Sequence, residues 1–233
     1  MRIYLGLLLL LAPAAQAQDN LPQPGQPELS TLGEQVSYSL GLDLGRRLKQ
    51  DGVQVDFGAI VAGLRDGLTD AEPMLTDEQI TQVMKQFQQQ MQQKAENQMA
   101  QAAQQNLARG AEFADQYAKK EGVQKTDSGL LYRVIEEGDG ASPGPEDTVR
   151  VHYEGTLTTG EVFDSSYRRG EPTEFPVGAV ISGWTEALQM MKSGAKWEVV
   201  LPPDIAYGAR GAGGAIGPNE TLVFKIELLD VLD

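Results

Sequence analysis

The chain has 233 residues, with 19 lysines and arginines, 33 aspartates and glutamates, one histidine, no cysteine and a formal net charge of −14. This length suits one large domain or two small ones; the missing cysteine excludes disulfides, thiol catalysis and cysteine-based zinc sites, and a single histidine excludes a polyhistidine metal site. The acidic balance argues against nucleic acid as a partner, because broad nucleic-acid binding needs clustered positive charge.

Residues 1–17 have the pattern of a cleavable signal peptide. Arg2 supplies a positive start, an apolar run follows, and the small residues Ala15 and Ala17 occupy the positions that a signal peptidase reads. The apolar run is too short to cross a bilayer about 30 Å thick as a helix, and no cysteine follows that could carry a lipid. We therefore expect an exported protein without a membrane anchor, in a bacterial periplasm, with outer-membrane association or secretion as the alternatives.

Two short helices are expected after a leader. Residues 18–30 contain three prolines and no apolar periodicity, which indicates a flexible leader. In residues 31–75, apolar positions recur every four residues until Gly52 ends a first helix, and Asp56 can cap a second one. The apolar side chains are Leu32, Val36, Leu40, Leu44 and Leu48 in the first helix and Phe57, Ile60, Val61, Leu64 and Leu68 in the second.

Residues 76–122 are predicted to form one long connecting helix. Thr76 and Gln79 have the spacing of a capping box. A continuous helix from residue 77 to 121 would be about 68 Å long. Its apolar stripe thins after Met99, so the second part is expected to stand in solvent as a spacer; a glutamine-rich coil is the alternative. The apolar faces of the first part and of the two shorter helices exceed what such a unit covers alone, which predicts a homodimer through residues 31–75.

From residue 123 to 233 the apolar period changes to two, which indicates half-buried antiparallel strands. The alternating segments are 130–135, 149–154, 196–201 and 222–228. Before the third of them, Trp184, Leu188 and Met191 share one side of a short helix. The expected fold class is therefore α+β: an all-α N-terminal region with a long connecting helix, then an antiparallel curved sheet wrapped on a short helix.

Residues 123–233 contain none of the common catalytic or metal-binding patterns. His152 shares a strand face with charged neighbours and is expected to point to solvent, so a serine triad or a histidine base is rejected. The glycine-rich stretch after Tyr207 precedes a strand and lacks the lysine of a phosphate-binding loop. Asp147, Asp164 and Asp204 lie in separate turns, so neither a metal site nor a cofactor is expected.

Five motifs follow one another in the second half. They are VHYEG at 151–155, GEVFDSS at 160–166, VISGWTEAL at 180–188, AYG at 206–208 and TLVFKI at 221–226. In this order they resemble the FK506-binding-protein family of peptidyl-prolyl isomerases, across about 126–232. The helical half, with QVSYSLGLDLG at 35–45, looks like the dimerisation region of the macrophage infectivity potentiator and periplasmic FkpA subgroup.

The resemblance implies an aromatic pocket that binds a twisted Xaa-Pro amide without a nucleophile, metal or cofactor. Trp184 would be its floor, Tyr207 would donate a hydrogen bond to a substrate carbonyl, and Asp164 would lie at its edge. The walls would be Tyr153, Phe163, Val180, Ile181 and Phe224, and Ile216 would keep one further wall contact. The loop after Tyr207 is poorer in bulky residues than is usual in the family.

Two functions of different classes follow. The first is a peptidyl-prolyl cis-trans isomerase that acts on unfolded or proline-containing exported polypeptides, with chaperone activity and with FK506- or rapamycin-type molecules as ligands. The second is a periplasmic chaperone or binding module in which isomerisation is incidental. In that case clients would contact a methionine-lined cleft of the dimer, with Met84, Met91 and Met99, because methionine adapts to varied partners.

Overall fold

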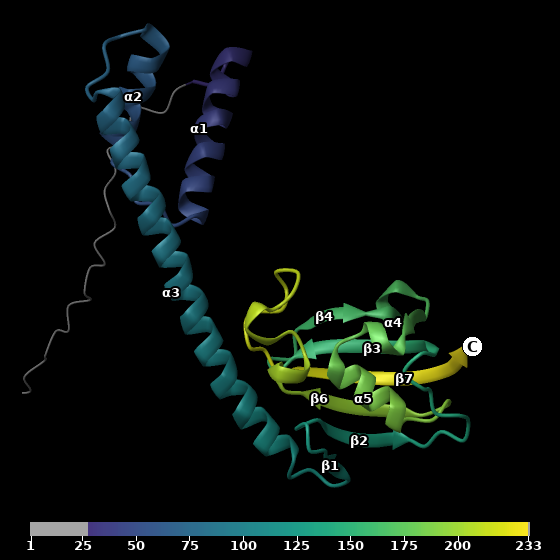
Figure 1. The fold of residues 1–233 in the computed structure, drawn as a ribbon. Helices are drawn as coiled ribbons and strands as arrows, with labels where there is room; N and C mark the ends of the chain where they lie inside the picture. Colours follow the sequence, from purple (N-terminus) through teal and green to yellow (C-terminus); the bar gives the residue numbers. More distant parts are fainter. Residues whose placement is uncertain (1–27, 233) are drawn as a thin grey trace, which may run out of the picture. The chain divides into compact units, whose positions relative to one another are not determined.

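The computed structural model describes residues 28–232 (Figure 1). The expected signal peptide and most of the expected leader lie outside the described residues. The chain divides into two compact units, of which the first ends at Thr76 and the second begins at Asp77. Among the described residues, no helix combines the length and apolar character needed to cross a membrane.

The first unit consists of α1 (Leu32–Gln50) and α2 (Phe57–Thr69), as predicted. Thr31 caps α1 in a capping box, accepting from the Glu34 backbone at 3.3 Å while the Glu34 carboxylate accepts from the Thr31 backbone at 2.8 Å. The Asp56 carboxylate accepts from the backbone of Ala59 at 2.8 Å and caps α2. Neither of these two helices has a buried residue, and their apolar side chains remain largely exposed.

The second unit begins with α3 (Asp77–Tyr117), a single helix of 41 residues. It starts where the capping-box spacing predicts and ends five residues before the expected end at residue 122. The expectation that its second part is a solvated spacer is wrong for its last turns, because Asn106, Gly110 and Tyr117 are buried. These three residues lie on one face of the helix. Recurring apolar residues do not reveal this face, because glycine and asparagine are not counted as apolar. Tyr117 packs with Leu131 and Val200 in a small core of its own.

Seven strands form one antiparallel sheet in the order β1-β2-β6-β7-β3-β4, with β5 paired to β3. The strands are β1 (Val123–Lys125), β2 (Leu131–Glu136), β3 (Thr148–Leu157), β4 (Val162–Ser165), β5 (Thr173–Pro176), β6 (Lys196–Leu201) and β7 (Leu222–Leu232). The four segments with period-two alternation are β2, β3, β6 and β7, as predicted. The shorter β1, β4 and β5 have too few residues for alternation to reveal them.

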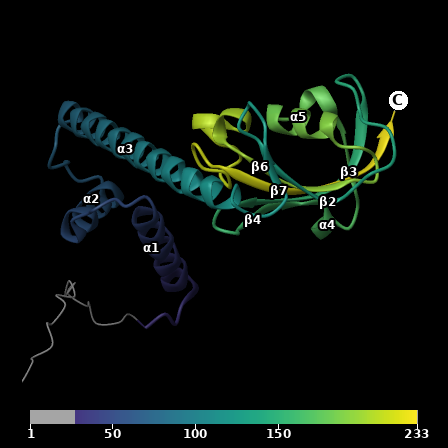
Figure 2. The same ribbon diagram turned by 90° about the horizontal axis from the view of Figure 1, so that it is seen from below.

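The sheet curves around α5 (Ser182–Met190), which lies against one of its faces (Figure 2). The main core fills this concave side, where Leu188 of α5 meets inward residues such as Val151 and Ile226, all fully buried. This arrangement confirms the predicted fold class. The opposite face of β2 and β6 carries the Tyr117 core instead, so the sheet is covered on both sides where α3 ends.

His152 lies on the outer face of β3, as its strand position predicts, but it is only partly exposed. The short helix α4 (Ser166–Arg169) covers it: the ring of Tyr167 stacks on the imidazole with centroids 4.7 Å apart, and the hydroxyl of Ser166 lies 3.0 Å from Nδ1. The expectation of a solvent-facing side chain is therefore wrong in degree, because α4 was not predicted. The imidazole remains outside the pocket described next.

Candidate active site

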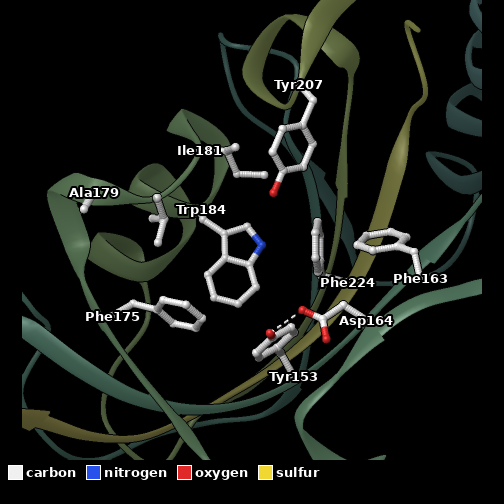
Figure 3. Close-up of a pocket in the computed structure, with 10 residues that line it drawn as sticks. Tyr153, Phe163, Asp164, Phe175, Ala179, Ile181, Trp184, Tyr207 and Phe224 are labelled. Carbon is white, nitrogen blue, oxygen red and sulfur yellow. Dashed lines mark hydrogen bonds between the residues drawn. The ribbon is translucent and has the colours of Figure 1, made fainter. Parts of the chain in front are cut away.

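A pocket of about 310 Å³ opens on the concave side of the sheet, between α5, the start of β4 and the loops around them (Figure 3). Most of its wall is aromatic. The residues that line it are Tyr153, Phe163, Asp164, Phe175, Ala179, Val180, Ile181, Trp184, Tyr207 and Phe224. Over all described residues, no cluster of histidine, cysteine, aspartate or glutamate could hold a metal ion.

Trp184 forms the floor of the pocket from the first turn of α5. Its indole is 4% exposed and meets three rings edge-on, with centroids 5.2 Å from Tyr153, 5.7 Å from Phe175 and 5.2 Å from Phe224. Edge-to-face contacts at these distances are favourable and fix the orientation of each ring. The indole is thereby held in place by three rings, and its buried N–H has no hydrogen-bond partner among the described residues.

One side wall is a pair of phenylalanines from different strands. Phe163 of β4 and Phe224 of β7 meet at an interplanar angle of 87°, with centroids 5.5 Å apart. Both rings lie over Gly155, where a Cβ atom would come within 2.5 Å of Phe163 and 2.7 Å of Phe224. Because Gly155 has no side chain, the two rings can pack directly on the backbone of β3 and line the pocket there.

A polar group closes the edge of the pocket beside Tyr153. The phenol of Tyr153 donates to the carboxylate of Asp164 at 2.5 Å, and the guanidinium of Arg169 pairs with the same carboxylate. Arg169 also donates to the Tyr153 hydroxyl at 2.9 Å and to Thr173 at 3.1 Å. The sequence motif includes Asp164 and Tyr153, but nothing in the pattern identifies Arg169 as their partner.

The protonation states of this polar group follow from its contacts. Burial opposes ionisation of Asp164, but the hydrogen bonds from Tyr153 and Arg169 outweigh burial, so the pKa of Asp164 lies below its ordinary value. Burial, and then the hydrogen bond to Asp164, raise the pKa of Tyr153. At neutral pH the edge therefore carries an ionised carboxylate that accepts hydrogen bonds and a neutral phenol that donates one.

Tyr207 approaches from the opposite side of the pocket. It is 40% exposed, and its hydroxyl points into the pocket (Figure 3) without a hydrogen-bond partner among the described residues. Next to it, Val180 and Ile181 form the turn that leads into α5, where the Ile181 carbonyl accepts from the Trp184 backbone at 2.9 Å. The pocket therefore offers one exposed hydroxyl donor beside the aromatic rings.

Eight of the nine residues expected at the site lie around this one pocket. The exception is Ile216, which is 8% exposed in the main core and pairs with Ala212 through two backbone hydrogen bonds of 2.9 and 3.0 Å. Ile216 therefore belongs to the main core and is not among the residues that line the pocket. Phe175 and Ala179 line the pocket in addition; the aromatic character of Phe175 was a usable signal, whereas nothing distinguishes Ala179 in the sequence.

Comparison with known proteins covers both halves of the chain. Residues 140–229 match the model of the FKBP-type peptidyl-prolyl cis-trans isomerases, and residues 33–134 match that of the domain amino-terminal to FKBP-type peptidyl-prolyl isomerase. The outer membrane protein MIP of Legionella longbeachae is 45% identical, covering 87% of each chain. The FKBP-type 22 kDa peptidyl-prolyl cis-trans isomerase of Escherichia coli K12 is 44% identical, covering 88% of this chain and 98% of the other.

Among solved structures, FkpA from Escherichia coli superposes with a TM-score of 0.74 at 40% identity, covering 87% of this chain and 98% of that one. The similarity therefore extends over the helical unit as well as over the sheet.

Proposed function

The chain belongs to the FKBP-type peptidyl-prolyl cis-trans isomerase family, and from this premise we propose how its pocket catalyses the rotation of Xaa-Pro bonds. The observation that carries the proposal is a preformed aromatic pocket with one free hydroxyl donor and one ionised carboxylate at opposite sides. The proline ring would rest on Trp184, and a substrate carbonyl would accept from Tyr207.

Apolar walls favour the transition state because of how amide resonance changes during rotation. A planar amide owes its barrier of about 18–20 kcal/mol to resonance, which also separates charge between nitrogen and oxygen. A twisted amide has lost most of this charge separation, so it is solvated less strongly by water than the planar form is. A pocket lined by Phe163, Phe224 and Trp184 excludes water and therefore stabilises the twisted amide relative to the planar one. The catalytic residues do this without forming a covalent bond to the substrate.

Asp164 acts at the edge of this pocket as a fixed negative charge. Because its pKa is low, it accepts from Tyr153 throughout the neutral range and holds that ring beside the Trp184 floor. The ionised carboxylate also faces the pocket, where it disfavours the partial negative charge of a planar carbonyl oxygen placed beside it. Both effects favour rotation of the bound amide.

The test is the cis-to-trans rate of a short Xaa-Pro peptide with catalytic amounts of the full-length mature protein. Tyr207→Phe and Asp164→Asn should each lower kcat/KM by about tenfold, the effect of about one lost hydrogen bond or charge contact in the transition state. Tyr132→Phe is the matched control, since its hydroxyl bonds to Gln124 outside the pocket. If Tyr207→Phe and Asp164→Asn isomerise the peptide as fast as the Tyr132→Phe control, the assignment of the pocket residues is refuted.

The helical unit supports homodimerisation as a second part of the proposal. Leu40 and Leu68 are 68% and 76% exposed, and the unit matches a domain that precedes isomerase domains in the family. Exposed apolar faces of this extent call for a partner, and a second copy fits a symmetric helical pair. Leu40→Glu should convert the dimer to a monomer in light scattering after size exclusion, whereas Ser39→Glu at the neighbouring position should not. If the wild-type protein is a monomer in the same measurement, the proposed homodimer is refuted.

Chaperone activity is the other function that a specific observation favours. Met84 and Met99 on α3 are 51% and 56% exposed, and flexible thioether side chains suit varied apolar clients. If isomerisation is incidental, Tyr207→Phe should protect a denatured client from aggregation as well as the wild type does. If protection falls together with the isomerase rate, the pocket itself binds the client and the alternative is refuted.

We further propose export to the periplasm, where exported polypeptides would be the clients. The support is the signal-peptide pattern of residues 1–17 and the relatives named as an outer membrane protein and as FkpA. N-terminal sequencing of the protein from the periplasmic fraction should begin at Gln18. Displacement of a peptide by FK506 would test the expected ligand class in the same pocket.

A further inference from the structure

The loop that carries Tyr207 has little in its own sequence to hold it in place. Between Tyr207 and the start of β7, the glycines Gly208, Gly211, Gly213 and Gly214 all have positive φ, from 55° to 73°. Glycine gains the most conformational freedom in the unfolded or detached state, so such a loop is expensive to order. Inside the loop the contacts are the Ala212–Ile216 pair, the buried side chain of Ile216, and backbone hydrogen bonds from Gly211 and Asn219 to the Gly208 carbonyl.

Further contacts come from outside the loop, from the last turns of α3. The side-chain amide of Asn106 donates to the carbonyl of Pro218 at 2.8 Å, at the end of the loop. Arg109, one turn further along α3, donates to the Asn106 side chain at 2.7 Å and to the buried Glu220 carboxylate at 2.9 Å. Its Nε atom donates to Thr158 at 3.1 Å, so the guanidinium also ties in the turn between β3 and β4.

These contacts form an interlocked group rather than surface pairs. Asn106 and Glu220 are each only 7% exposed, and a buried side-chain amide or carboxylate is costly unless it is bonded. The fit is close as well: a Cβ atom on Gly217 would lie 3.1 Å from the Asn106 amide nitrogen. We call Asn106, Arg109 and Glu220 the helix clamp.

The clamp reaches Tyr207 through the backbone. The residue after Pro218 is Asn219, whose N–H donates to the carbonyl of Gly208 at 2.8 Å. Gly208 directly follows Tyr207, so this bond closes the loop at its base next to the pocket. A hydrogen bond that holds Pro218 therefore also restrains the backbone at Gly208, the residue next to Tyr207.

We propose that Asn106 is a positioning residue of the isomerase site: through Pro218, Asn219 and Gly208 it holds the Tyr207 hydroxyl over the pocket. The inference rests on the role proposed above for Tyr207. It places a residue of the connecting helix, 101 positions before Tyr207 in the chain, in the support of the catalytic pocket. The isomerase unit thus includes the last turns of α3, and changes in that helix reach the pocket.

The test is a double-mutant cycle in the full-length mature protein. Asn106→Ala should lower kcat/KM for an Xaa-Pro peptide by about threefold to tenfold, the range expected for one lost hydrogen bond. In a Tyr207→Phe background the same substitution should lower it less than twofold, because the hydroxyl that it positions is absent. Gln105→Ala is the matched control, since this neighbouring amide is exposed.

Two further measurements keep the proposal falsifiable if Asn106→Ala is unstable. Gly217→Ala perturbs the same contact from the side of the loop and should act in the same direction. Amide hydrogen exchange at Asn219 should speed up in both variants, whereas the Ile226 amide in the middle of β7 should keep its protection. A uniform loss of protection would indicate a general loss of stability and refute a positioning role.

The outcomes separate this inference from the proposed function. If Tyr207→Phe lowers the rate and Asn106→Ala lowers it further by the same factor in both backgrounds, the clamp does not act through Tyr207 and the inference fails alone. If Tyr207→Phe keeps full activity, the proposed role of Tyr207 fails, and unchanged exchange at Asn219 would then refute the clamp as well.

Discussion

The sharpest stability prediction concerns Gly110, where α3 crosses the start of β7. A Cβ atom at this position would lie 2.2 Å from the hydroxyl oxygen of Thr221 and 2.9 Å from its Cβ atom. Thr221 is 3% exposed and cannot turn away into solvent. In an exposed helix, replacing glycine by alanine stabilises by about 1 kcal/mol, so the sign of Gly110→Ala is decided by the contact with Thr221.

The size of the effect follows from the shift that the extra methyl group requires. To reach an ordinary contact distance, α3 must move away from β7 by about 1 Å, and overpacking of this kind costs typically 1–3 kcal/mol. The same shift stretches the hydrogen bonds of Asn106 and Arg109, each worth about 0.5–1.5 kcal/mol or more when charged. After the helix-propensity gain is subtracted, we expect a net loss of about 2 kcal/mol.

The assay is thermal unfolding followed by tryptophan emission. Trp184 and Trp197 both lie in the second unit, so the signal reports that unit alone. For a domain of this size, about 2 kcal/mol corresponds to a midpoint lower by about 4–8 °C. Thr221→Ala removes the nearer of the two atoms, and the double variant with Gly110→Ala should recover part of the loss. A midpoint that stays the same or rises in Gly110→Ala would show that α3 is not docked on the sheet.

Two further predictions concern the pocket. Gly155→Ala should push Phe163 and Phe224 into it and lower kcat/KM by more than tenfold while the chain stays folded, because a Cβ atom there would lie within 2.7 Å of both rings; a peptide isomerisation assay alongside circular dichroism checks this, and an unimpaired rate would contradict it. Arg169→Gln should raise the pKa of Asp164, since it removes interactions that outweigh burial and lower it. The folded pKa lies below the ordinary 3.8, so the stability that the ionised carboxylate contributes is present above that value and is lost as the pH falls through the lower folded pKa. In the variant the folded pKa lies closer to that of the unfolded chain, so this loss should be smaller and should end at a higher pH. A carbon-13 NMR titration of the Asp164 carboxyl group measures the folded pKa, and an unchanged titration midpoint would count against the contact.

The short-range pattern of the sequence determined the elements themselves. Apolar recurrence with caps at Thr31 and Asp56 predicted α1 and α2, and alternation predicted β3 and β7. These succeed because burial of one face imposes a period on any chain that forms a helix or a strand. Short elements such as α4 gave no such period and were not predicted, which is why His152 was expected to be more exposed than it is.

The motifs predicted most of the residues that line the pocket: eight of the nine residues expected at the site are among them. The residue that does not, Ile216, was assigned as the one bulky side chain of the loop after Tyr207, whereas its position depends on how a glycine-rich loop turns back on itself. Arg169 is the converse case, because the structure places it at the site although the sequence did not predict it there. Its partners Asp164 and Tyr153 come from two different strands, and a hydrogen bond between separate elements leaves no spacing in the chain.

The role of α3 was decided by tertiary structure. Its last turns read as a polar spacer because the residues that pack there include Asn106 and Gly110, which an apolar pattern does not count. Asn106 can be buried because the carbonyl of Pro218 accepts a hydrogen bond from its amide. Position 110 requires glycine because Thr221 leaves no room for a side chain there. Local sequence determines which segments bury a face, but close approach and paired polar groups depend on what the rest of the fold places opposite them.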